Sequence, residues 1–270
     1  FEQKPWQEKL QSLDFQPVHN FYLELAKKSG VDPGKLNYIP QERILFLPEQ
    51  RSYYESDGNY IVIGVKGIQN KAITLDGDLN LALLWVVAHE QQHAVSKTTY
   101  AEDQNTGKPL IKGSGYQAIK TISEEPLTEL SYPTIDEGLT EYLARQAVRR
   151  TVANSPTGFH TDPVSLERLI DQNEISLAYF LEVRFIRRLI IELAKSTDLP
   201  EDTVEQALIR GKFSGELLDD PVISQGMAEA VGQEIWEKLR TLSTGNLGVP
   251  MYVMMQQLGW IDDDLKQKIH

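Results

Sequence analysis

The sequence contains no cysteine, and this absence excludes several kinds of site at once. Without a thiol the chain forms no disulfide bond, binds no zinc or iron–sulfur cluster through sulfur, and has no cysteine nucleophile. A metal ion must therefore be held by histidine, aspartate or glutamate. The lack of cysteine fits the cytosol as well as an oxidising compartment, so it does not identify the compartment by itself.

Positive charge is also scarce. The chain of 270 residues has 27 Lys and Arg against 39 Asp and Glu, which gives a net charge of −12 at pH 7. A protein that neutralises nucleic-acid phosphates needs a basic surface. We therefore expect no nucleic-acid partner. The hydrophobic share of 41% and the charged share of 24% are those of an ordinary globular protein, which excludes a wholly disordered chain.

Long hydrophobic runs are absent as well. The apolar run at residues 81 to 88 is far shorter than the roughly 20 residues that a membrane-spanning helix needs, so we expect no membrane span. The chain begins with Phe1 and not with methionine, which suggests a mature form from which a signal or anchor segment was removed. Together with the lack of cysteine, this start favours a secreted or extracytoplasmic bacterial protein, although the compartment stays open.

The pattern of apolar residues predicts an α+β protein in two lobes. Residues 43 to 48 and 59 to 65 are β-rich and enclose the turn residues Asp57 and Gly58, which indicates a small mixed sheet. The N-terminal lobe, residues 1 to 135, also contains an apolar helix that begins after the helix cap Asp78 and a broken, loop-rich insertion at 96 to 135. The C-terminal lobe, residues 136 to 270, is mostly helical. We expect helices at residues 6 to 28, 136 to 152, 163 to 171, 177 to 195, 201 to 209, 227 to 242 and 251 to 258, and a short strand near 116 to 122.

The apolar helix ends in His89-Glu90-Gln91-Gln92-His93, a match to the pattern H-E-x-x-H. Residues i and i+4 share one face of a helix, so both imidazoles can bind one ion. Glu90 lies about 100° round the helix from His89, beside the ion and not on it. Zinc with three protein ligands keeps an open position for catalysis, and a carboxylate beside it can act as a general base.

A second helix, expected to open just after Pro133, carries Glu137 and Glu141 four residues apart, so both carboxylates share one face. One of them can bind zinc, and the other can accept the free N–H of a ligating histidine, which fixes the tautomer of that ring.

These two segments, H-E-x-x-H and Asp136-Glu137-Gly138-Leu139-Thr140-Glu141-Tyr142, resemble the gluzincin metallopeptidases, zincins with a glutamate as third zinc ligand. The group includes thermolysin-like and aminopeptidase-type enzymes. The resemblance implies a zincin-like fold, one Zn²⁺ per chain held by His89, His93 and Glu137, Glu90 as the catalytic base, and Glu141 as the histidine's partner.

Two features limit the resemblance. The 43 residues from 94 to 136 separate His93 from Glu137, about twice the spacing of those enzymes, so no family within the group is identified. The related metzincin pattern would need glycine at Ser96 and histidine at Thr99, and it is excluded.

Simpler explanations exist for each motif. The histidine pair would also suit a buried helix in which neighbouring carbonyl groups satisfy both rings, and Glu137 with Glu141 would suit the solvated face of an amphipathic helix. Arg184, with Arg187 and Arg188, could bind a substrate carboxylate or pair with acidic groups of the chain itself.

We expect a zinc metallopeptidase that hydrolyses peptide bonds of a peptide or protein substrate. The alternatives are a zinc-bound module that captures a peptide without cleaving it, and an effector protease of narrow specificity. Residue type alone does not select the group that stabilises the oxyanion: His160, Tyr179, Tyr116 and Tyr252 all qualify.

Overall fold

A computed structural model describes residues 2–102, 109–115, 132–155, 158–174, 177, 179–215, 221–241 and 248–269. The protein is predominantly helical and contains a three-stranded mixed sheet and a two-stranded sheet, so the prediction of an α+β protein is confirmed at that level. By contacts the chain divides into two compact units. The first consists of Phe1–Glu24, Pro33–Val95 and Thr140–Ala178, and the second of Leu25–Asp32, Ser96–Leu139 and Tyr179–His270.

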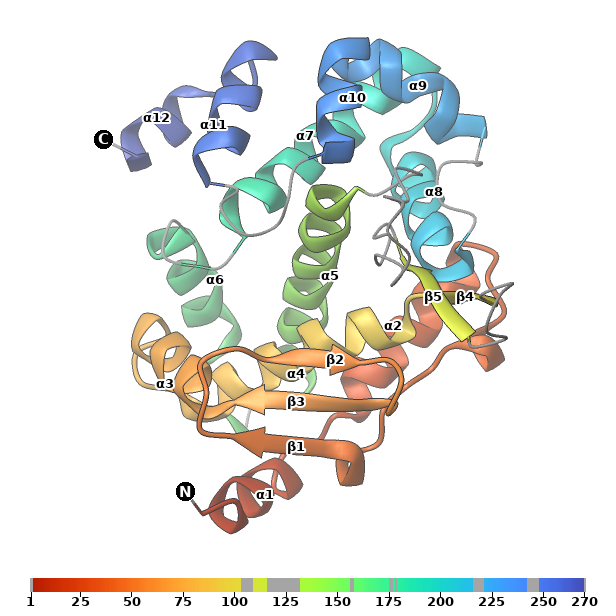
Figure 1. Cartoon of the computed structure of the whole chain (residues 1–270). Helices are drawn as coiled ribbons and strands as arrows, with labels where there is room; N and C mark the ends of the chain where they lie inside the picture. Colours follow the sequence, from red (N-terminus) through yellow and green to blue (C-terminus); the bar gives the residue numbers. More distant parts are fainter. Residues whose placement is uncertain are drawn as a thin grey trace. The chain divides into compact units, whose positions relative to one another are not determined.

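The first unit is built on the three-stranded sheet, in the order β1, β3, β2 (Figure 1). Strand β3 (Tyr60–Gly64) runs parallel to β1 (Ile44–Leu47) and antiparallel to β2 (Tyr53–Glu55). Ile61, Val62 and Ile63 of the central strand are all buried. Burial on both faces explains the continuous apolar run that the sequence shows there.

Helix α4 (Leu79–Val95) packs on this sheet and on α3 (Val65–Thr74). Its residues from Leu81 to Trp85 are fully buried, as the apolar run predicts. Asp78 caps the helix, because its Oδ1 accepts the N–H of Leu81 at 2.9 Å. Its Oδ2 accepts the N–H groups of His160 and Thr161, which joins the segment before α6 (Pro163–Gln172) to the start of α4.

The first unit corrects three expectations. Residues 6 to 28 form two helices, α1 (Lys4–Gln11) and α2 (Gln16–Lys28), because the Asp14 carboxylate accepts the N–H of Gln16 and starts the second helix. Strand β2 and helix α3 were not expected. The predicted turn at Asp57 and Gly58 is present, but it connects β2 to β3.

The second unit contains the hairpin β4 (Thr98–Glu102) and β5 (Pro109–Ser114), the first residues of α5 (Pro133–Asn154), and a group of C-terminal helices. Helix α7 (Phe180–Thr197) buries Phe185, Ile186 and Leu189 among its neighbours. These neighbours are α8 (Glu201–Ser214), α9 (Pro221–Val231) and α11 (Gly248–Gln257). Residues 227 to 242 do not form one helix, because Gly232, at φ +78°, separates α9 from α10 (Gln233–Thr241).

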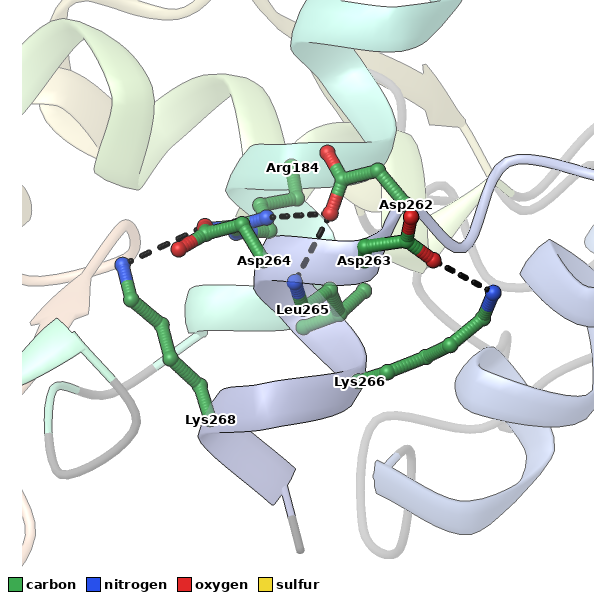
Figure 2. A network of polar contacts seen from close by, with 7 residues as sticks. All are labelled: Arg184, Asp262, Asp263, Asp264, Leu265, Lys266 and Lys268. Atoms are coloured by element: carbon green, nitrogen blue, oxygen red, sulfur yellow. Dashed lines mark hydrogen bonds and ion pairs between the residues drawn. The ribbon is translucent and has the colours of Figure 1, made fainter.

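The C-terminal helix α12 (Asp263–Ile269) was not expected from the sequence. Figure 2 shows how it is attached to α7: Arg184 contacts Asp262 at 3.4 Å and Asp264 at 2.5 Å. The Asp262 carboxylate also accepts the N–H of Leu265 at 2.7 Å and so caps α12. Arg184 therefore pairs with acidic groups of the chain itself, the second of the two alternatives for this arginine.

The remaining predicted helices are present with somewhat different ends. The strand expected at 116 to 122 lies outside the described residues. Within the part of the chain that the structure describes, no single helix is both long and apolar enough to cross a membrane. Helices α3 and α4 together have the length and apolar composition of a membrane span, but the chain bends by 118° between them. The predicted domain boundary after residue 135 stays a prediction.

Candidate metal centre

Helix α4 places His89 and His93 one turn apart on the same side. Their ring centroids lie 5.1 Å apart, with the rings inclined at 69°. His89 is only 9% exposed, because it follows directly on the buried apolar stretch of the helix. The spacing of four residues thus brings two nitrogen donors to one place, as the sequence predicts.

Helix α5 adds the third donor. One ligand atom each from His89, His93 and Glu137 lie within 4.8 Å of one another. Ligand atoms at zinc distances of about 2.0–2.1 Å in a tetrahedron are about 3.4 Å apart. Small side-chain movements would therefore bring the three atoms into contact with one ion. The structure thus brings together the three residues that the sequence singled out, in a group that could hold a metal ion.

Glu141 lies one turn after Glu137 and is 1% exposed. Its carboxylate contacts three side chains: Oε2 lies 2.9 Å from His89 Nδ1, and Oε1 accepts from Trp85 Nε1 at 2.9 Å and from Arg145 Nε at 3.1 Å. A carboxylate that accepts this many hydrogen bonds is fixed in position.

The charge of Glu141 decides which nitrogen of His89 is available. Burial alone would raise the pKa of Glu141, but Lys71, the hydrogen bond from His89 and the Arg145 guanidinium lower this pKa to about 2. An ionised carboxylate only accepts hydrogen bonds, so His89 Nδ1 carries the proton. The lone pair of His89 Nε2 is then free to bind a metal ion.

Three residues of this network were not expected from the sequence: Trp85, Arg145 and Lys71. The Lys71 ammonium lies 4.3 Å from the centre of the Trp85 ring. Burial lowers the pKa of Lys71, whereas the negative charges of Glu141 and Glu90 raise it. Trp85 precedes His89 by four residues and Arg145 follows Glu141 by four, so helical spacing could have identified both. Lys71 carries no such signal, because its helix α3 was not predicted.

Glu90, the predicted base, lies on α4 and is 6% exposed. The adjacent residues of α4 are held by the first unit. Gln91 pairs with the backbone of Ile39, accepting its N–H at 3.0 Å and donating to its carbonyl at 2.5 Å. The Tyr22 hydroxyl donates to the Ala88 carbonyl at 2.8 Å. These bonds fix the turn of α4 that carries His89 and Glu90.

Three of the four residues that could stabilise an oxyanion lie in the described part of the chain: His160, Tyr179, and Tyr252 of α11. Tyr116 lies outside the described residues, and the backbone N–H of His160 donates to Asp78. Tyr179 precedes α7 in a left-handed conformation with φ 56°.

No protein-family model matches the chain, and no curated protein or solved structure matches it. The interpretation of this centre therefore depends on its residues and their geometry.

Proposed function

We propose that the protein is a zinc-dependent peptidase of the gluzincin type with a zincin-like fold. One observation carries the proposal: two imidazoles and a carboxylate converge within 4.8 Å, and a buried glutamate orients one of the imidazoles. Neutral imidazole and carboxylate form the usual donor set of catalytic zinc, whereas hard ions such as Mg²⁺ prefer oxygen donors alone. Three protein ligands leave one position open, as catalysis requires.

In this proposal His89, His93 and Glu137 hold one Zn²⁺. When bound, zinc would polarise the carbonyl of the scissile peptide and make a nearby water more acidic. The Glu90 carboxylate accepts a proton from the attacking water, and a C–O bond forms as the carbonyl carbon becomes tetrahedral. Glu90 then gives this proton to the amide nitrogen as the C–N bond breaks, which releases an amine and a carboxylic acid, and the acid's proton passes to the amine. Glu141 keeps the Nδ1 proton of His89 in place throughout.

The variant Glu90→Gln tests this role. Glutamine has nearly the shape of glutamate but cannot accept the proton, so cleavage of casein or of a peptide library should fall by at least about 10²- to 10⁴-fold. Zinc content and the thermal midpoint should stay near those of the parent, because Glu90 is not a ligand.

The result also separates the alternatives. If Glu90→Gln cleaves as fast as the parent, the proposed mechanism is wrong. If neither protein cleaves any peptide but both bind peptides equally, the chain is a zinc-bound interaction module. Cleavage of one protein substrate and of no library peptide would indicate an effector protease.

A further inference from the structure

The N-terminal end of α5, which carries the ligand Glu137, is held from both sides. Asp136 is 1% exposed and forms an ion pair with Lys212 Nζ of α8. On the other side, a Cβ at Gly138 would lie 2.8 Å from Ile186 Cγ1 and 2.9 Å from the Glu182 carbonyl oxygen of α7. The residues immediately before and after Glu137 are therefore fixed by two different helices.

Lys212 connects this end of α5 to the hairpin as well. It is 0% exposed, and its Nζ also lies 3.4 Å from the Asp136 carbonyl oxygen. Its own carbonyl accepts the N–H of Lys97 at 3.1 Å, and the Lys97 carbonyl accepts the N–H of Gly115 at 3.1 Å. Lys97 and Gly115 flank the two ends of the hairpin β4–β5. Gly115, at φ +56°, leaves no room for a side chain, because a Cβ would meet the Asp136 carboxylate and lie 3.1 Å from Lys212 Nζ.

Stability is a poor explanation for this pair. Removing two charges from water costs about as much as their attraction returns, and apolar replacements of a buried ion pair are often neutral or stabilising. The pair does fix the position of Asp136, and with it the backbone next to Glu137. The first backbone N–H groups of a helix have no partner within the helix, and helix ends open more readily than helix centres. Glu137 lies only four residues after the start of α5.

We infer that Lys212 is a positioning residue for the metal ligand Glu137, acting through its ion pair with Asp136. This inference rests on the proposed function, since it gives α8 a role toward the same metal centre. With the pair in place, the end of α5 presents the Glu137 carboxylate to the ion without first having to be ordered.

The test compares zinc affinity and fold in the full chain. Lys212→Met alone leaves the Asp136 carboxylate buried without its cation and should lose thermal stability. The double variant Lys212→Met/Asp136→Ala removes both charges and places a good helix former in α5. Zinc affinity is measured by competition with a chromophoric chelator, and the ligand set by the visible spectrum of the Co²⁺-loaded protein. The control is Lys195→Met, the same change in the 2.9 Å ion pair with Glu192.

We expect the double variant to keep the circular-dichroism spectrum of the metal-free parent, to bind zinc about 10- to 100-fold more weakly, and to show a changed Co²⁺ spectrum. The control should bind as the parent does. Affinity equal to the parent's in the folded double variant would overturn the inference alone. Loss of the folded state in both the single and the double variant would also overturn it, because the pair would then hold the fold and not the ligand. A parent that binds no zinc would overturn the inference and the proposed function together.

Discussion

Glu141 is the residue on which the candidate centre is organised. It contacts a candidate ligand, His89, and two supporting groups, Trp85 and Arg145. A charge this deeply buried is tolerated only when its oxygens are paired, and removing one partner of a buried ion pair typically costs about 3–5 kcal/mol. A test of Glu141 must therefore keep its shape.

The proposed ligand Glu137 and the carboxylate of Glu141, which supports His89, should respond differently to mutation. Glu137→Ala removes a donor atom and should abolish zinc retention during dialysis. Glu141→Gln keeps the shape but loses the charge that orients His89, so zinc affinity should fall by about 10- to 100-fold. Chelator competition measures both. If the Glu141 variant loses the metal while Glu137→Ala retains it, the two roles are exchanged.

Trp85 offers a milder perturbation of the same network. Trp85→Phe removes the N–H that donates to Glu141 and leaves a smaller ring at a site that is 0% exposed. We expect a loss of about 1–3 kcal/mol in the free energy of unfolding, measured in urea, and zinc binding weakened by up to about tenfold.

A matched change separates packing from positioning. Trp260 is 8% exposed and packs against Phe185, so Trp260→Phe also removes buried aromatic volume. It should lower stability without lowering zinc affinity. Equal zinc affinities in both variants would show that the Trp85 N–H does not support the centre.

At the scale of elements, the sequence predicted the two helices of the centre well. The long apolar run, the cap Asp78 and the spacing of His89 and His93 are local features, and α4 follows from them. The hydrogen bond from Trp85 to Glu141 and the effect of the Lys71 charge on this carboxylate depend on how α3, α4 and α5 pack, which no local pattern contains. The ends of helices were also less predictable: Asp14 and Gly232 divide segments whose apolar spacing continues across the break.

The close approach of α5 and α7 at Gly138 gives a prediction for these elements. Alanine would gain up to about 1 kcal/mol in helix propensity, but its Cβ would press on the Glu182 carbonyl oxygen, which is backbone and cannot turn away. Overpacking of this kind costs about 1–3 kcal/mol, so Gly138→Ala should lower the free energy of unfolding in urea. Gly158→Ala, where a Cβ meets nothing within 4 Å, is the control. A Gly138→Ala variant more stable than the parent would contradict this packing.

At the scale of the whole molecule, the two compact units interleave along the chain. Segments as distant as Phe1–Glu24 and Thr140–Ala178 belong to one unit, and two of the boundaries, after Glu24 and after Leu139, fall inside α2 and α5. A boundary read from the sequence divides the chain at one point, whereas contacts group segments by their neighbours in space.

Zinc should stabilise the whole chain through mass action. A ligand that binds only the folded state adds about 2.7 kcal/mol when its free concentration is 100 times its dissociation constant. For a chain of this size about 1 kcal/mol moves the thermal midpoint by about 2–4 °C, so zinc should raise the midpoint by about 5–10 °C, and a chelator should reverse the rise. Elemental analysis should find close to one zinc per chain.

Two variants show whether the rise in the midpoint comes from the proposed site. Glu90→Gln should keep the zinc-dependent rise, because Glu90 is not one of the three proposed ligands, whereas Glu137→Ala should lose it. Magnesium at the same concentration should have little effect, since imidazole is a poor ligand for that ion. If the parent's midpoint does not change up to millimolar zinc and elemental analysis finds no transition metal, the three side chains do not form a zinc site. The proposed zinc-dependent hydrolysis is then wrong as well.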